Sequence, residues 1–142
     1  MKTYITHSEK ETRYLAKKIA KKITHGVVAL TGELGAGKTT FAQGFAEGLG
    51  IKDKIISPTF VLIRQHKIPK LQKILYHIDL YRLADDKDLK GLGLKEILQD
   101  QNNVVLIEWA EKAKSFLPKE TLWISFQYID GQKRSIRISP MF

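Results

Sequence analysis

The sequence contains no cysteine, and it contains no uninterrupted apolar run long enough to cross a membrane. The absence of cysteine excludes a disulfide framework and a cysteine-based zinc site. Residues 1–11 also lack the apolar core of a signal peptide, so we expect a soluble, cytoplasmic protein with no membrane partner. A chain of 142 residues is long enough for a full core, and we expect one domain over residues 1–142.

Arginine is scarce although the chain is basic. Only five of the 24 Lys and Arg residues are arginines, and the formal net charge is +9. The lysines are spread along the chain, which is typical of a solvated lysine-rich surface; a basic face for RNA or for an acidic partner is the alternative. The four histidines are scattered without the spacing of a metal site. Charge alone therefore does not define a partner.

Residues 32–39 read GELGAGKT and match the phosphate-binding pattern GxxxxGK(S/T). Residues 27–30 before this loop favour a buried strand, and residues 40–49 after it favour a helix. In that context the N–H groups of the loop and of the helix start donate to phosphate oxygens. Lys38 neutralises the β- and γ-phosphates, and the Thr39 hydroxyl is a Mg²⁺ ligand. The sequence therefore predicts a nucleotide-binding protein.

Periodic and alternating apolar residues predict the other elements. A capping box at Ser8 and Glu11 begins an amphipathic helix over residues 8–24, and the apolar run 104–107 predicts a buried strand. The remaining expected elements are a hairpin of residues 61–66 and 73–79, two short helices within 84–99, and a terminal hairpin of residues 122–128 and 135–138. These elements predict an α/β fold, a P-loop NTPase-like three-layer domain whose mixed, partly parallel sheet carries antiparallel hairpins.

Two acidic residues follow predicted strands and are candidates for the catalytic part of the site. Glu108 follows residues 104–107 like a Walker B carboxylate, where Asp is more usual, and is a candidate Mg²⁺ ligand; a strand-capping carboxylate is the alternative. Asp79 could position water, act as a base or hold a magnesium-bound water; an ion pair with Arg82 is the alternative. Residues 57–59 form either a switch-like loop or a plain turn.

Four segments together resemble those of the bacterial TsaE family, also called YjeE. They are GELGAGKTT, SPTF, HIDLYR and IEW, and their order and spacing match over nearly the whole chain. The family consists of small P-loop ATPases required for threonylcarbamoyladenosine formation next to the anticodon of tRNA. The resemblance implies ATP and Mg²⁺ as cofactors and the proteins TsaB and TsaD as partners. TsaD would carry the transferase site, and this chain would act on tRNA indirectly or through that complex. The resemblance does not fix how ATP hydrolysis serves the modification. Because the sequence has a P-loop site and no evident acceptor-binding domain, our hypothesis is that hydrolysis resets the complex between turnovers.

The resemblance also implies roles for individual residues. Thr39 and Glu108 would be the Mg²⁺ ligands. Residues 6–9 would form part of the family's purine pocket, and the terminal hairpin near Lys133 and Arg134 would close over the nucleotide. The implied catalytic residues are Lys38, Asp79 and Glu108. The implied nucleotide-binding residues are Glu9, Glu33, Leu34, Gly35, Ala36, Gly37, Lys38, Thr39, Thr40 and Arg134.

Other functions fit the phosphate-binding loop less well. No arginine finger is evident, so intrinsic hydrolysis should be slow and a partner would complete the site. A small-molecule kinase needs an acceptor pocket and an arginine-rich lid, which five arginines and a short chain do not favour. Residues 88–91 formally match a DxxG switch, but no NKxD element supports a GTPase. A nucleotide-gated module that binds tRNA directly, without significant catalysis, is a further alternative.

Overall fold

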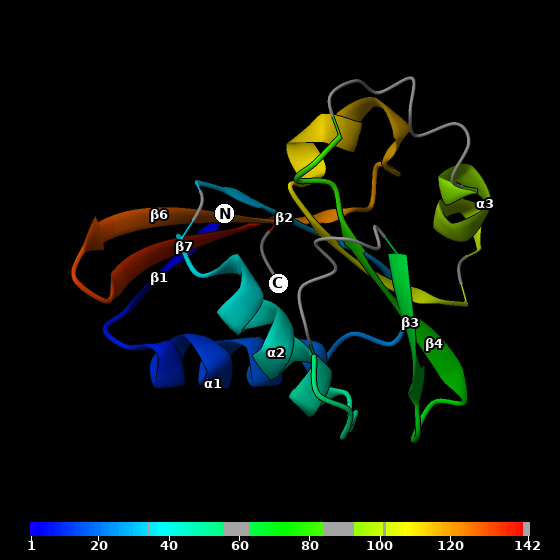
Figure 1. Cartoon of the computed structure of the whole chain (residues 1–142), viewed down its shortest axis with the longest axis horizontal. Coiled ribbons are helices and arrows are strands. Elements are labelled where there is room, and N and C mark those ends of the chain that lie inside the picture. The colour runs from blue at the N-terminus through cyan, green and yellow to red at the C-terminus, as the bar shows by residue number, and fades with distance from the viewer. Residues whose placement is uncertain (34, 56–62, 84–92, 101, 141–142) are drawn as a thin grey trace.

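The computed structural model describes residues 1–33, 35–55, 63–83, 93–100 and 102–140. Within these residues a seven-stranded sheet has the strand order β1-β7-β6-β2-β5-β4-β3 (Figure 1). Its strands are β1 (Lys2–Thr6), β2 (Gly26–Gly32), β3 (Ile63–Ile68), β4 (Lys73–Asp79), β5 (Val104–Glu108), β6 (Leu122–Asp130) and β7 (Lys133–Ser139). The helices are α1 (Glu9–Ala20), α2 (Lys38–Gly48), α3 (Leu94–Gln99) and the 3₁₀ helix η2 (Ala110–Phe116).

The centre of the sheet is parallel and its two sides are antiparallel. β2 pairs in parallel with both β5 and β6, and β5 pairs in parallel with β4. The pairs β1 with β7, β6 with β7, and β3 with β4 are antiparallel. The predicted mixed sheet with antiparallel hairpins is therefore confirmed. Because parallel strands run the same way, the carboxyl ends of β2, β4 and β5 lie side by side at one end of the strands.

Each face of the sheet carries its own apolar core, which explains the near-continuous apolar run in β2. Val28 and Leu30 point to one face and pack in a cluster with residues of α1 and α2 such as Phe41. Val27 and Ala29 point to the other face and pack in a cluster with residues of α3 and η2. Helices thus cover both faces (Figure 1), and the predicted three-layer α/β fold is confirmed.

Helix α1 begins where the capping box predicts, but it ends earlier. The Ser8 hydroxyl accepts the Glu11 backbone N–H at 3.1 Å. The predicted end at residue 24 is wrong, because α1 ends at Ala20. Beyond it, the N–H groups of Lys22 and Ile23 bond to carbonyls three residues back, a tighter turn that closes the helix before β2 starts.

Helices α1 and α2 cross at a very short distance because Gly44 has no side chain. A Cβ built on Gly44 would lie 2.3 Å from the Arg13 carbonyl oxygen, which no real side chain tolerates. The crossing brings the start of α1 beside the start of α2. Residues of both helix starts can therefore line one pocket.

Other boundaries differ from expectation at the ends of the sheet. β1 is not predicted from the sequence; it lies at the edge of the described sheet, pairs with β7, and has mostly polar residues. Of the strand predicted over 61–66, residues 61–62 lie outside the described residues, and the rest is observed in β3, which continues to Ile68. β4 confirms the predicted return strand over 73–79. Of the two short helices expected within 84–99, α3 is present. Residues 57–59 and 84–92, including the segment 88–91, lie outside the described residues.

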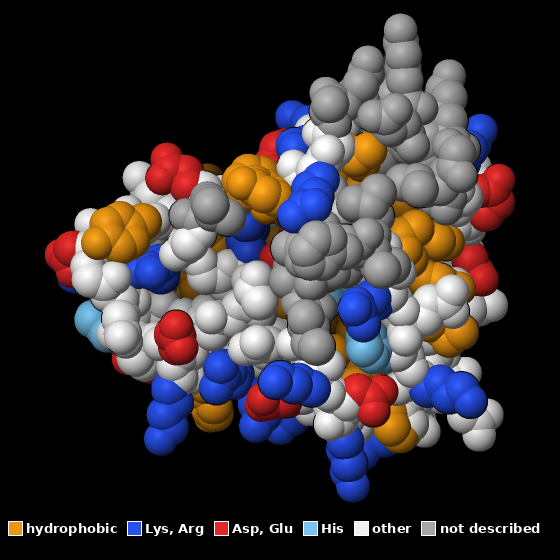
Figure 2. Space-filling view, in the orientation of Figure 1, with side chains coloured by type: hydrophobic (Ala, Val, Ile, Leu, Met, Phe, Trp, Pro, Cys, Tyr) orange, Lys and Arg blue, Asp and Glu red, His pale blue; other side chains and the backbone are white. Residues whose placement is uncertain are grey.

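The lysines of α1 point away from the core. Lys10 and Lys18 of α1 are exposed, as are Lys21 and Lys22 in the turn that follows it, and Lys and Arg side chains gather along the lower edge of the molecule in Figure 2. Both hypotheses for this surface, a solvated face and a basic face for a partner, stay open. None of the helices in the described ranges is both long enough and apolar enough to span a bilayer.

Candidate active site

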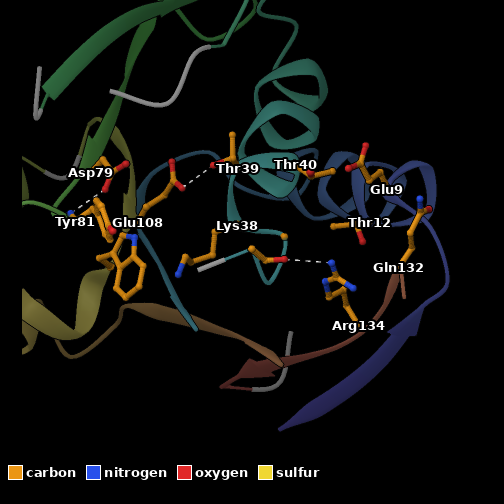
Figure 3. A pocket seen from close by; sticks show the side chains of 13 residues that line it. Glu9, Thr12, Lys38, Thr39, Thr40, Asp79, Tyr81, Glu108, Gln132 and Arg134 are labelled. Carbon is orange, nitrogen blue, oxygen red and sulfur yellow. Dashed lines mark hydrogen bonds between the residues drawn. The ribbon is translucent and has the colours of Figure 1, made fainter. Parts of the chain in front are cut away.

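A pocket of about 420 Å³ lies between the carboxyl ends of β2, β4 and β5 and the start of α2 (Figure 3). It is lined by Glu9, Thr12, Gly35, Gly37, Lys38, Thr39, Thr40, Asp79, Tyr81, Glu108, Trp109, Gln132 and Arg134. Two ends can be distinguished. The acid end consists of Thr39, Asp79 and Glu108, and the hairpin end consists of Glu9, Thr12, Gln132 and Arg134. Lys38 lies between them (Figure 3).

The residue before α2 and the first turn of that helix leave the helix start open to an anion. Gly37 is the residue before α2 and has φ of 107°, a left-handed conformation that favours glycine. No side chain caps the start of α2, and its first turn contains no acidic residue. The N–H groups at this helix start and the positive end of the helix dipole therefore remain suited to an anion.

Lys38 lies in the centre of the pocket and is 5% exposed. Its ammonium donates to the main-chain carbonyls of Gly32 and Glu33, the latter at 3.3 Å. Its nitrogen is also 3.6 Å from the centroid of the Trp109 ring. Burial lowers the pKa of Lys38, while the carboxylates of Glu111, Glu108 and Asp79 act in the opposite direction.

Trp109 follows Glu108 directly and has a strained backbone. Its φ of 59° is unusual for a bulky residue, and such strain tends to occur at functional sites. Its ring packs against that of Tyr81 with the centroids 5.2 Å apart. The two rings therefore form an aromatic wall beside the Lys38 ammonium.

Thr39 and Glu108 meet although they are 69 positions apart in the sequence. The Thr39 hydroxyl donates to one carboxylate oxygen of Glu108, Oε1, at 3.2 Å. The other oxygen, Oε2, is 2.6 Å from Nε2 of His77, and the Glu108 residue is 2% exposed. A hydroxyl and a carboxylate side by side are oxygen ligands of the kind that Mg²⁺ prefers.

Asp79 completes the acid end through the register of the sheet. It lies directly opposite Glu108 in the parallel pairing of β4 with β5. Its Oδ1 accepts the backbone N–H of Tyr81 at 2.9 Å, which fixes the carboxylate at the strand end. Among the described residues, no group of three or more His, Cys, Asp or Glu side chains has the geometry of a metal site. A Mg²⁺ ion here would take the remaining ligands from phosphate oxygens and water.

The hairpin end is built from the beginning of α1, from the turn between β6 and β7, and from the start of β7. Arg134 donates from Nη2 to the Gly35 carbonyl at 3.1 Å, which ties the terminal hairpin to the phosphate loop. Its guanidinium also lies 4.8 Å from the centroid of the Tyr128 ring. The Thr12 hydroxyl, in turn, is 2.7 Å from that of Thr6.

A model of the family "Threonylcarbamoyl adenosine biosynthesis protein TsaE" matches residues 6–136. The chain belongs to the TsaE family. The TsaE of Bacillus subtilis is 42% identical over 137 residues, which is 96% of this chain and 84% of that protein. The TsaE of Haemophilus influenzae is 38% identical over 107 residues, or 75% of this chain and 66% of that protein.

A solved structure of the TsaE family has the same fold. The crystal structure of Bacillus subtilis YdiB is similar with a TM-score of 0.78 and 38% identity, covering 95% of this chain and 82% of that chain. The resemblance inferred from the four sequence segments is therefore confirmed. The roles of individual residues remain predictions, for which the geometry of the pocket is the physical support.

Most residues implied for the TsaE site lie in the pocket. The exceptions are Glu33, whose side chain is exposed, Ala36, which is buried in the core, and Leu34, which lies outside the described residues. Of residues 6–9, expected at the purine pocket, Glu9 lines the pocket and residues 6–8 do not. Four residues at or behind the pocket have no role predicted from the sequence, and these are Thr12, His77, Tyr81 and Gln132. His77 and Tyr81 belong to the HIDLYR segment, which was the available signal, whereas Thr12 and Gln132 belong to no motif.

Proposed function

We propose that this TsaE family member binds ATP with Mg²⁺ in the pocket and hydrolyses it during threonylcarbamoyladenosine formation next to the anticodon of tRNA. The observation that carries the proposal is the contact of the Thr39 hydroxyl with the buried Glu108 carboxylate at the start of the phosphate-loop helix. A P-loop hydroxyl paired with a carboxylate at the end of a neighbouring strand is the arrangement of P-loop NTPases.

The chain supplies separate groups for phosphate binding and for metal binding. The N–H groups at the start of α2 and the Lys38 ammonium would hold the phosphates. Thr39 and Glu108 are the residues that would hold Mg²⁺, which neutralises phosphate charge and orients the phosphates when it is bound. The hairpin end offers the hydrogen-bonding groups of Glu9 and Gln132 to the rest of the nucleotide.

Asp79 is the residue best placed to act on the attacking water. Its carboxylate is buried at the acid end and is held by the Tyr81 N–H, so its orientation is fixed in advance. It would accept a hydrogen bond from the water that attacks the terminal phosphorus atom, and would orient that water in line with the leaving oxygen. Among the described lining residues the one arginine is Arg134, at the opposite end. Slow intrinsic hydrolysis follows.

A partner would then complete the site. We infer that TsaB and TsaD are these partners, that TsaD carries out the acyl transfer to tRNA, and that hydrolysis by this chain resets their complex between turnovers. Support for this comes from the family membership and from the pocket, which combines a phosphate site with an acid end.

The test is steady-state ATP turnover by the purified chain, alone and with TsaB, TsaD and tRNA added. Strong stimulation, lost in Lys38→Ala, is the expected result. Intact ATP binding without stimulation would overturn the partner role, and the absence of any ATP binding would overturn the ATPase assignment itself. Transfer of labelled phosphate to a small acceptor would instead identify a kinase. Tight tRNA binding by the chain alone, without turnover, would identify a nucleotide-gated binding module.

A further inference from the structure

His77 is a buried histidine next to the candidate metal ligand. Its side chain is 0% exposed, and its Nε2 is 2.6 Å from Glu108 Oε2. It precedes Asp79 by two positions on β4, so both side chains point to the same face of the sheet. The register of β4 with β5 places Leu106 opposite His77 and Glu108 opposite Asp79. The histidine therefore approaches Glu108 from behind, on the side away from the pocket.

We propose that His77 is a positioning residue that holds the Glu108 carboxylate in the orientation needed for metal binding. This inference rests on the proposed function, in which Glu108 is a Mg²⁺ ligand. An ionised carboxylate oxygen only accepts hydrogen bonds, so the contact requires the hydrogen on Nε2 of His77. With Oε2 fixed by that bond, Oε1 faces the Thr39 hydroxyl at 3.2 Å and lies at the pocket.

The side chain of Glu108 explains why such a residue is needed. Glutamate has one more rotatable bond than the aspartate that usually ends a Walker B strand, so its carboxylate has more orientations available. A donor behind the carboxylate removes this freedom and stabilises the buried charge. Hydrogen bonds of this kind to metal-binding side chains orient the ligand, and their loss typically lowers metal affinity about 10–100-fold.

The experiment measures the binding of Mn²⁺, a paramagnetic substitute for Mg²⁺, to the complex of the protein with a slowly hydrolysed ATP analogue. His77→Leu keeps a buried apolar side chain but removes the donor, and should weaken Mn²⁺ binding about tenfold. His77→Gln retains an N–H donor and should stay within about threefold of the wild type. Leu75→Ala, a buried change two positions earlier on the same strand, is the matched control and should lower the melting temperature without changing Mn²⁺ affinity.

Metal-free nucleotide affinity separates a positioning role from a packing role. It should be equal in the wild type and in His77→Leu, because His77 contacts Glu108 and is not among the described residues that line the pocket. Unchanged Mn²⁺ affinity in His77→Leu would overturn the inference, as would equal losses in His77→Leu and His77→Gln. If the wild-type complex itself bound no Mn²⁺, the metal site of the proposed function would be wrong, and the inference would fail with it.

A spectroscopic measurement on the unaltered protein keeps the inference testable even if His77→Leu does not fold. Long-range ¹⁵N–¹H NMR distinguishes which ring nitrogen of a histidine carries hydrogen. We expect hydrogen on Nε2 of His77 and an altered chemical shift for it in Glu108→Gln. Hydrogen on Nδ1 alone would exclude donation to Glu108 and would overturn the inference.

Discussion

The two ends of the pocket are built in different ways. The acid end lies on the parallel centre of the sheet, where Asp79 and Glu108 are 4% and 2% exposed and are held by hydrogen bonds on their inner sides. The hairpin end lies on the antiparallel edge, where Glu9 and Gln132 are exposed and the Arg134 bond to Gly35 connects the hairpin with the phosphate loop. We therefore expect the buried acid end to carry the chemistry and the exposed hairpin end to contribute nucleotide contacts.

The strongest test of this division is Glu108→Gln, which removes the carboxylate charge from the acid end but keeps its shape. We expect ATP turnover to fall by about 10³-fold, since charge stabilisation at a metal site contributes several kcal/mol to catalysis. Steady-state phosphate release measures the effect. Glu111→Gln, which changes an exposed carboxylate near Lys38, is the control and should have less than about tenfold effect. Equal losses in both variants would show that general charge, rather than metal binding, matters.

Asp79→Asn tests whether the acid end acts on water as well as on metal. We expect kcat to fall by about 10²-fold, because an amide cannot accept the water proton as a carboxylate does. Nucleotide affinity should stay within about twofold of the wild type, since Asp79 lies at the acid end, apart from the phosphate loop. Equilibrium titration and single-turnover hydrolysis together separate the two effects. A loss confined to affinity would move Asp79 from the chemical step to binding.

Arg134→Ala tests the hairpin end and should produce the opposite pattern. We expect nucleotide affinity to weaken about fivefold and kcat at saturation to change less than about twofold. Lys133→Ala is the matched control, because the neighbouring Lys133 does not line the pocket. A large fall in kcat with unchanged affinity would mean that Arg134 contributes to the transition state, and the separation of the two ends would be wrong.

The smallest expected effect is a change in tryptophan emission at the acid end. Lys38 lies against Trp109, so a phosphate that attracts the ammonium should change the environment of this ring. The chain has two tryptophans. The change on adding ATP should persist in Trp123→Phe and disappear in Trp109→Phe. If the change persisted in Trp109→Phe and disappeared in Trp123→Phe, the response would come from Trp123 on β6 instead.

The sequence predicts the acid end better than the hairpin end, and the reason is physical. Short apolar runs predict buried parallel strands. A carboxylate directly after such a run lies at the carboxyl end of its strand, and this does not depend on which strands pair beside it. Glu108 and Asp79 could thus be predicted from spacing alone. The Arg134 bond to Gly35 joins residues 99 positions apart through an edge whose strand β1 has mostly polar residues. Such a contact depends on tertiary packing, which no local pattern reports.

The same distinction applies to individual side chains and boundaries. His77 carries no local signal for a contact with Glu108, because the contact arises only when β4 pairs with β5. The end of α1 at Ala20 could not be predicted either, because apolar spacing continues to Ile23 while the main chain already tightens into a turn. Amphipathic periodicity reports which face is buried and is a weak guide to where a helix stops.

The β-bulge of the terminal hairpin has a consequence for how this chain accommodates insertions and deletions. The β6–β7 register shifts between Tyr128 and Asp130, on the tip side of the pair formed by Tyr128 and Arg134. An added residue at the tip can be absorbed there, leaving Arg134 in place. Within β5, by contrast, one added residue would turn Glu108 to the opposite face of the sheet. Changes in chain length can therefore accumulate at the hairpin tip, whereas the five residues of β5 must keep their number.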